Sequence, residues 1–167
     1  MKPTRTILLA LPLALALAAC GDEAGTEGSI SGEPVAEVAA PEGQSWLETV
    51  AVSDSDGYIL GNPDAPIKLI EFASYTCGAC ANFIENGVEP LKADYVESGR
   101  VSYELRNLIR DPIDLSVAVL ARCGSPESFH PLSEQVWQNF QTIMGGAQQN
   151  GQAIEAAMQR PENERLV

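Results

Sequence analysis

The sequence predicts an α/β fold that contains a parallel βαβ unit, and three observations support this prediction. Residues 67–72, IKLIEF, form a short apolar run that is typical of a buried strand. Apolar residues then recur at helical spacing over residues 81–100, and residues 101–108, VSYELRNL, alternate between apolar and polar side chains as a second strand would. A strand, a helix and a strand in this order form a parallel pair with a right-handed crossover.

A small hairpin is expected before this unit. Residues 49–60, TVAVSDSDGYIL, alternate on both sides of an Asp-Gly pair, which is a turn signal. We expect the strand at 67–72 to lie inside a sheet because it is short and apolar. Within the helix that follows, Pro90 should divide the apolar stretch and Gly99 should end it.

The chain looks helical beyond Asp111. Apolar spacing predicts three helical segments, at residues 113–123, 127–144 and 151–160. Cys123 lies on the first of them and is expected to be a small buried hydrophobic residue, with a redox or metal-ligand role as the alternative. His130 precedes a proline and is expected to lie in a solvated loop.

The first 19 residues have the features of an export signal. Lys2 and Arg5 precede an apolar stretch of 13 residues, which is too short for a bilayer because spanning one needs ~20 residues. The stretch ends in LAAC, residues 17–20, which resembles the lipobox of bacterial lipoproteins. The resemblance implies cleavage before Cys20 and acylation of its sulfur, whereas in an ordinary secretory signal Cys20 would have no role. Both alternatives place the mature chain outside the cytosol, where disulfides persist.

The mature chain is strongly acidic. The full sequence has 10 basic and 23 acidic residues, and removal of residues 1–19 takes away two basic residues and no acidic one, which leaves a net charge of −15. This charge argues against nucleic acid and anionic surfaces as partners. Residues 20–45 carry acidic side chains among Gly, Ser, Ala and Pro, without Lys or Arg, so we expect an acidic disordered tether before a folded domain at 46–167.

Cys77 and Cys80 lie where the first strand of the βαβ unit gives way to its helix. Free N–H groups and the helix dipole would favour a thiolate at Cys77, and Cys80 would lie within disulfide range on the same turn. A purely structural staple is disfavoured, because closing so short a loop restricts the unfolded chain by only roughly 2 kcal/mol. Metal binding stays an alternative, although zinc usually needs four ligands and the chain adds only Cys123 and His130, far along the sequence.

Three stretches together resemble the DsbA-like thiol-disulfide oxidoreductases of thioredoxin fold, from about residue 58 to the end. They are GNPDAPIKLIEFASYTCGACANF at 61–83, the strand VSYELRN with RDP after it, and the helical region that follows. The resemblance implies a thioredoxin-like fold with a helical insertion that starts at about residue 111. It also leads us to expect a cis-proline loop, two further antiparallel strands and a last helix, which residues up to Val167 do not supply. We therefore expect a sheet edge with unpaired backbone groups, and a reading frame that continues past Val167.

The same resemblance assigns roles to the site residues. It implies that Cys77 is the nucleophile, that Cys80 is the resolving thiol, and that Glu71 is a buried carboxylate that assists proton transfer to Cys80. Independently, a Glu within an apolar strand should have a raised pKa and act as a base, unless it faces outward. The strongest oxidants of the family carry His just before the resolving cysteine, and this chain has Gly78-Ala79 between its thiols, so we expect a weaker oxidant.

These observations predict an extracytoplasmic thiol-disulfide oxidoreductase that exchanges a Cys77–Cys80 disulfide with thiols of exported proteins, in the oxidising direction. No cofactor is expected. The expected partners are exported proteins with cysteine thiols and a membrane redox partner for recycling, and the chain should be a periplasmic monomer anchored by lipid at Cys20. The alternatives are a reductase of the same fold, a periplasmic metallochaperone that binds copper or zinc through the CxxC, and a non-catalytic interaction protein.

Overall fold

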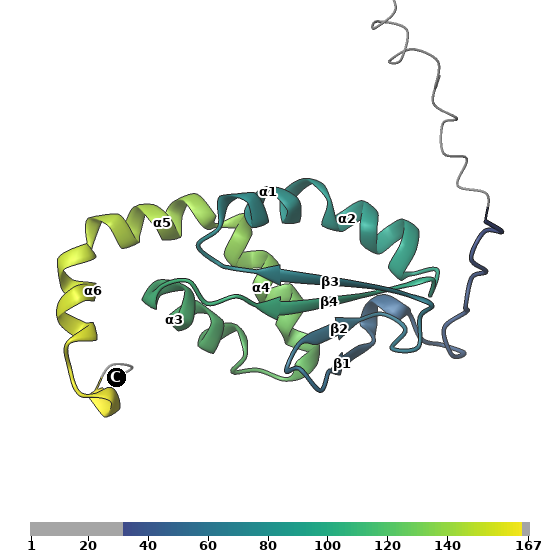
Figure 1. Ribbon diagram of the computed structural model, residues 1–167, viewed down its shortest axis with the longest axis horizontal. Coiled ribbons are helices and arrows are strands. Elements are labelled where there is room, and N and C mark those ends of the chain that lie inside the picture. Colours follow the sequence, from purple (N-terminus) through teal and green to yellow (C-terminus); the bar gives the residue numbers. More distant parts are fainter. Residues whose placement is uncertain (1–31, 165–167) are drawn as a thin grey trace, which may run out of the picture. The chain divides into compact units, whose positions relative to one another are not determined.

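The computed structural model describes residues 32–164, and the folded unit within it begins at Val35 (Figure 1). Its sheet has four strands in the order β1-β2-β4-β3. β2 pairs antiparallel with β1 and β4, whereas β3 and β4 are parallel, so the predicted hairpin and βαβ unit are both confirmed. The strands are β1 (Val50–Val52), β2 (Tyr58–Leu60), β3 (Ile67–Ala73) and β4 (Val101–Asn107).

Helices connect β3 to β4 and make up the chain after β4. Among the described residues, none of them is long and apolar enough to cross a membrane. The helices are α1 (Gly78–Asn86), α2 (Val88–Leu91), α3 (Pro112–Ala121), α4 (Phe129–Gln138), α5 (Phe140–Gln149) and α6 (Gly151–Met158). A π-helical turn spans Lys92–Val96, and short 3₁₀ turns lie at Trp46–Glu48, Pro126–Ser128 and Glu162–Glu164.

Among the described residues, β1 forms one edge of the sheet and β3 forms the other. We predicted this strand to be interior, but within the described residues it pairs only with β4, and β4 lies between β2 and β3. Ile70 and Phe72 are exposed as a result, with Phe72 60% exposed. An apolar run shows that a strand is suited to burial, but it does not show which neighbours the fold provides.

The helical connection breaks at Gly87, not at Pro90 as predicted. Pro90 is the third residue of α2, in the first turn, where backbone N–H groups have no partner within the helix and proline is therefore tolerated. Gly99 follows the π-helical turn with φ +69°, and a Cβ at this position would lie 2.2 Å from the carbonyl oxygen of Val38. Only glycine fits there, which explains why the helical segment ends at this residue.

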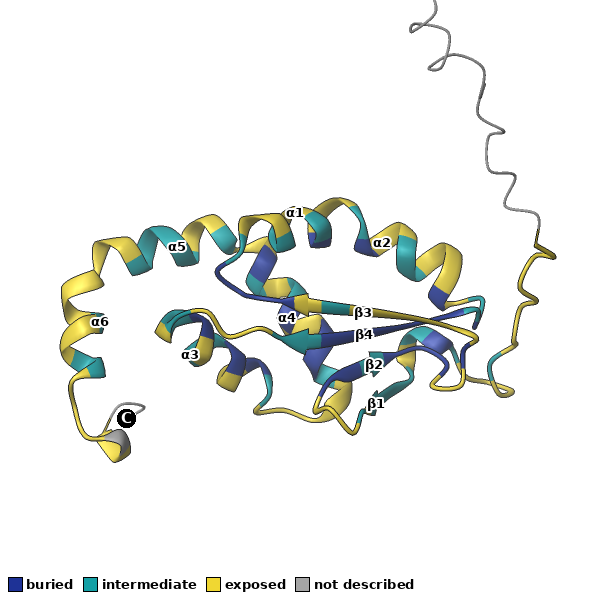
Figure 2. Ribbon diagram, viewed as in Figure 1, coloured by how far each residue is buried: buried dark blue, intermediate teal, exposed yellow. Residues whose placement is uncertain are grey.

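One core joins the sheet to α1, α3 and α4 (Figure 2). The rings of Tyr58 on β2 and Phe129 on α4 stack with centroids 3.8 Å apart, and those of Tyr75 and Trp137 lie 4.6 Å apart. Such aromatic pairs add about 1 kcal/mol each to the burial of their surfaces. Tyr75 belongs to the loop that leads to Cys77, so its contact with Trp137 attaches this loop to α4.

His130 contributes to this core, contrary to the prediction of a solvated loop. It is the second residue of α4, its ring is buried, and its Nε2 lies 3.1 Å from the carbonyl oxygen of Tyr58. Burial lowers the pKa of His130 to about 4, so the imidazole is neutral at physiological pH. The proline after it occupies the first turn of α4, where proline is favoured, so the His-Pro pair marks a helix start.

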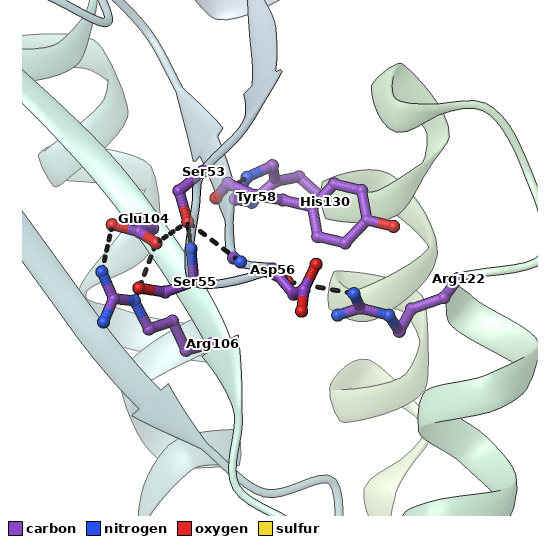
Figure 3. A network of polar contacts seen from close by, with 9 residues as sticks. Ser53, Ser55, Asp56, Tyr58, Glu104, Arg106, Arg122 and His130 are labelled. Atoms are coloured by element: carbon purple, nitrogen blue, oxygen red, sulfur yellow. Dashed lines mark hydrogen bonds and ion pairs between the residues drawn. The ribbon is translucent and has the colours of Figure 1, made fainter.

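Polar contacts fix the β1–β2 turn to the rest of the fold (Figure 3). Ser53 Oγ donates to Glu104 Oε1 at 2.5 Å, and Arg106 Nε donates to the same oxygen at 2.7 Å. On the other side, Arg122 Nη2 donates to the carbonyl oxygen of Asp56 at 3.0 Å, and Asp56 has a positive φ of 57°. The turn is therefore held from β4 and from the end of α3.

The segment before β1 also contacts the folded unit. Val38 N donates to the carbonyl oxygen of Ser98 at 3.0 Å, and Trp46 Nε1 donates to the carbonyl oxygen of Val38 at 2.7 Å. The predictions of a signal at 1–19, of acylation at Cys20 and of a tether over residues 20–31 concern residues outside the described range, whereas residues 35–45, also predicted to be tether, belong to the folded unit.

Candidate active site

Cys77 and Cys80 lie at the start of α1, directly after β3 and a three-residue loop. Cys77 is the N-cap residue and Cys80 is the third residue of the helix. Both are free thiols and both side chains are partly buried. The loop after the strand, Ser74–Thr76, is buried. The helix then begins at Gly78, which has no side chain to cover its first turn.

The pKa values of the two thiols are displaced in opposite directions. Hydrogen bonding from the backbone and thiol of Cys80 lowers the pKa of Cys77, and the Ala79 N–H and the positive charge of Arg110 act in the same direction. Burial raises the pKa of Cys80 to about 11, and the charges of Cys77 and Glu71 raise it further. Near pH 7, Cys77 is thus the more readily ionised thiol, and Cys80 keeps its proton.

Glu71 faces this pair from β3. Its charge acts on Cys80, and its Oε2 accepts a hydrogen bond from the hydroxyl of Tyr103 on β4. Burial raises the pKa of Glu71 above its ordinary value, and the bond from Tyr103 opposes this effect. The structure therefore brings three residues singled out in the sequence, Cys77, Cys80 and Glu71, into one site, with a carboxylate suited to exchange a proton with the buried thiol.

Sequence reasoning did not assign a role to Asp114, which anchors the loop before Cys77. The carboxylate is 0% exposed and accepts bonds from Ser74 Oγ at 2.5 Å, Tyr75 N at 2.9 Å and Arg110 N at 3.1 Å. The pair Asp111-Pro112 predicts a helix start, which places Asp114 in the first turn. The contact of Asp114 with a loop 40 residues earlier in the chain depends on the fold.

Asp111 and Arg110, close to Asp114 in the chain, both bind Thr76, the residue before Cys77. Asp111 caps α3 through Ile113 N and Asp114 N, and its second oxygen accepts from Thr76 Oγ1 at 2.6 Å. Arg110 Nη2 donates to the carbonyl oxygen of Thr76 at 3.2 Å. The segment 110–114 therefore fixes Ser74–Thr76 and brings a guanidinium near Cys77.

A cavity of about 400 Å³ begins beside Cys77, at Gly78. Trp137 and Phe140 supply its aromatic wall, and both polar and apolar side chains, from α1, α4 and α5, supply the rest. A Cβ at Gly78 would lie 3.8 Å from the ring of Phe140, an ordinary contact distance. The cavity thus begins at the residue that follows Cys77.

The family model described as thioredoxin matches residues 53–165, which is more than half of the chain. The chain belongs to the thioredoxin family. The predicted α/β class, the thioredoxin-like fold and the resemblance to thioredoxin-fold disulfide oxidoreductases are confirmed.

Relatives of this thioredoxin-family chain carry names that refer to disulfides. A protein of Rickettsia felis, provisionally named a protein-disulfide oxidoreductase, is 34% identical over 101 residues, which are 60% of this chain and 36% of the relative. Disulfide bond formation protein D of Bacillus subtilis is 28% identical over 80 residues, 48% of this chain and 31% of its own length. The chain thus spans about a third of the length of these relatives.

Solved structures show the same fold. The crystal structure of a protein-disulfide isomerase from Novosphingobium aromaticivorans has a TM-score of 0.58 and 34% identity, and the match covers 65% of this chain and 56% of that one. The MdbA thiol-disulfide oxidoreductase of Corynebacterium diphtheriae, with a TM-score of 0.50, 21% identity and coverage of 60% and 56%, supports the fold alone.

Cys123 lies away from the site in this thioredoxin-family chain, and the prediction of its burial is wrong. It is exposed, two residues after α3 ends, and its Sγ donates to the carbonyl oxygen of Val119 at 3.1 Å. α3 buries Ala118 and Ala121, one turn apart, so the apolar stretch around Cys123 is turned partly to solvent. Within residues 32–164 no three His, Cys, Asp or Glu side chains gather as metal ligands would.

Proposed function

We propose that this chain is an extracytoplasmic thiol-disulfide oxidoreductase that exchanges a Cys77–Cys80 disulfide with thiols of exported proteins. The observation that carries the proposal is the opposite displacement of the two thiol pKa values on one helical turn, with Glu71 beside the buried thiol. The disulfide-related names of the relatives support it. Structural ion pairs also displace pKa values, but they do not place a thiolate beside a second thiol and a base.

In the oxidising direction, a thiolate of the client attacks Sγ of Cys77 in the protein disulfide. A mixed disulfide forms, Cys80 leaves as a thiolate, and protonated Glu71 supplies its proton. A second client thiolate then attacks the client sulfur, and Cys77 leaves as the stable thiolate. The client loses two electrons and two protons in all, and the Cys77–Cys80 pair takes up both electrons.

The low pKa of Cys77 favours this direction, because a stable thiolate is a good leaving group. Gly78-Ala79 adds no imidazole to stabilise it, so we expect a weaker oxidant than family members with His at that place. Repeated turnover needs an electron acceptor for the reduced pair, which we assign to a membrane redox partner. The cavity beside Gly78 offers room for the client residues next to the reacting cysteine.

A redox titration combined with a metal assay on the same sample tests this function. The full chain is equilibrated with thiol-disulfide buffers, and the Cys77–Cys80 state is read by mass after alkylation. We expect one reversible two-electron transition that Cys123→Ser leaves unchanged. Copper or zinc bound in stoichiometric amount, without such a transition, would instead establish the metallochaperone, which no comparison favours.

We further propose that the chain is exported, cleaved before Cys20 and anchored to a bacterial membrane by lipid on that sulfur. In this arrangement the residues from Cys20 to Pro34 act as the acidic tether, and the folded unit that begins at Val35 forms the periplasmic domain, which we expect to be monomeric. The LAAC stretch and the apolar signal before it support the proposal.

Replacing Cys20 with serine should remove the anchor. In a bacterial host we expect Cys20→Ser to leave the detergent phase on phase partitioning, because an exported chain without acyl groups has nothing to insert into a micelle. Cys123→Ser is the matched control and should partition like the wild type. A cleaved Cys20→Ser product that still enters the detergent phase would place the anchor elsewhere.

A further inference from the structure

The hydroxyl of Tyr103 donates a hydrogen bond to the carboxylate of Glu71, the residue that faces the cysteine pair. Tyr103 is 1% exposed on β4, and its hydroxyl donates to Glu71 Oε2. In the register of the parallel pair, Tyr103 lies opposite Leu69, so Glu71 lies two residues further along on the same face of the sheet. A buried phenol needs a partner, and here its partner is the proposed base.

Charged and titratable groups from three other elements face this pair. Cys80 faces it from α1, and His130 and Glu134 face it from α4, with the His130 ring centroid 5.5 Å from that of Tyr103. Lys92, in the π-helical turn, is held by Glu134 at 3.1 Å and by Glu89 at 2.7 Å. This cation is therefore engaged by other carboxylates, and His130 is neutral.

Tyr103 is a permanent donor in these surroundings. Burial raises its pKa far above that of an ordinary tyrosine, and the charge of Glu71 raises it further. The hydroxyl keeps its proton at any pH at which the protein works. Among the described residues, Tyr103 is the one side chain that gives a hydrogen bond to Glu71.

We propose that Tyr103 is a positioning residue for Glu71: its hydroxyl holds one carboxylate oxygen and leaves the other oxygen to exchange a proton with Cys80. The inference rests on the proposed function and deepens it. Burial and the hydrogen bond oppose each other at Glu71, so loss of the hydroxyl leaves burial unopposed. A protonated Glu71 cannot take the proton that Cys80 must lose before it attacks.

The two half-reactions can be watched separately with an aromatic disulfide that releases a coloured thiolate. The Cys77 thiolate attacks the reagent, forms a mixed disulfide and releases one coloured thiolate. Cys80 then gives its proton to Glu71, attacks Sγ of Cys77 and releases the second. The protein dithiol loses two electrons and the reagent disulfide gains them. A full-length chain with Cys20→Ser and Cys123→Ser restricts the reaction to the active pair.

We expect Tyr103→Phe to slow the second release about tenfold at pH 6 and twofold or less at pH 8.5, because the pKa of Glu71 rises when a charge-stabilising donor is lost. The first release should stay unchanged at both pH values. In a Glu71→Gln background, Tyr103→Phe should have no further effect on the second release. Tyr95→Phe, which removes a hydroxyl from a tyrosine that is 50% exposed, is the matched control and should behave like the parent chain.

Three outcomes overturn the inference: an unshifted pH profile in Tyr103→Phe, an equal slowing of both releases, or a further loss in the Glu71→Gln background. If Tyr103→Phe fails to fold, 3-fluorotyrosine at position 103 keeps the ring and supplies a stronger donor. The pH at which the second release reaches half of its maximal rate must then be lower than in the parent chain. An unchanged value rejects the inference. Absence of any second release from the parent chain would refute the proposed exchange function instead.

Discussion

Cys77→Ala should exchange no disulfides, a loss on the order of 10³-fold or more, because the remaining thiol of the pair is protonated near pH 7. Cys80→Ala should keep the attacking thiolate and, when it is given a client disulfide, release one client thiolate and accumulate the mixed disulfide, since nothing remains to resolve it. The measurements are turnover of a reduced client by the oxidised chain, and non-reducing separation of the adducts that each reduced variant forms with a client disulfide. Adducts in Cys77→Ala at the level of Cys80→Ala would reverse the assignment.

The pKa difference can be checked on the wild-type chain. At pH 6 to 7, alkylation of the reduced protein should label Cys77 well before Cys80 or Cys123, because only a thiol with a lowered pKa is substantially ionised there. Cys123 serves as the internal control for exposure, since it is the more accessible thiol. As pH rises toward 9, Cys80 should remain the slowest of the three because burial raises its pKa to about 11. Equal rates at all three sites would contradict the assignment of the nucleophile.

Asp114→Ala should lower the free energy of unfolding by roughly 3 kcal/mol or more. It leaves the Ser74 hydroxyl and the N–H groups of Tyr75 and Arg110 without their acceptor in a buried place, and each such group costs about 1 to 3 kcal/mol. Denaturant unfolding measures the change, and alkylation of Cys77 in the same variant reports the loop. Labelling of Cys77 should slow at pH 6 to 7, because the Arg110 charge is no longer held near the sulfur.

Two matched variants separate the causes of this effect. Asp114→Asn keeps the shape and one acceptor oxygen, so it should lose less stability than Asp114→Ala. Asp64→Ala removes an exposed carboxylate and should stay within about 0.5 kcal/mol of the wild type. If the buried and the exposed substitution cost the same, Asp114 does not anchor the loop.

The order of strand, helix and strand could be predicted from the sequence because it rests on local periodicity. The place of Cys77 at the helix start could be predicted for the same reason. The position of β3 at the edge could not, because pairing is decided by segments far apart, and β4 comes to lie between the hairpin and β3. The parallel register of β3 and β4 brings Tyr103 next to Glu71, and no local sequence pattern contains that register.

Two errors came from proline and from helix length. His130-Pro131 was predicted to be a loop because proline often ends helices, yet proline also suits a first turn, and α4 starts one residue earlier. Cys123 was predicted to be buried because it ends an apolar stretch, but α3 stops at Ala121 and turns away from the core there. In both cases the boundary of a helix, set to within one or two residues, decided the environment of the side chain.

The N-cap position of Cys77 couples oxidation of the pair to the folding of α1. In many helices a hydroxyl or carboxylate oxygen at this position accepts a hydrogen bond from the first turn. A cysteine sulfur is a comparable acceptor only while it is negatively charged. Forming the disulfide removes the charge from the positive end of the helix dipole. In a closed thermodynamic cycle, any free energy that the thiolate gives to the start of α1 also makes the disulfide easier to reduce, by the same amount. A substitution in the first turn of α1 can therefore change the reduction potential through helix formation, even when it touches neither sulfur.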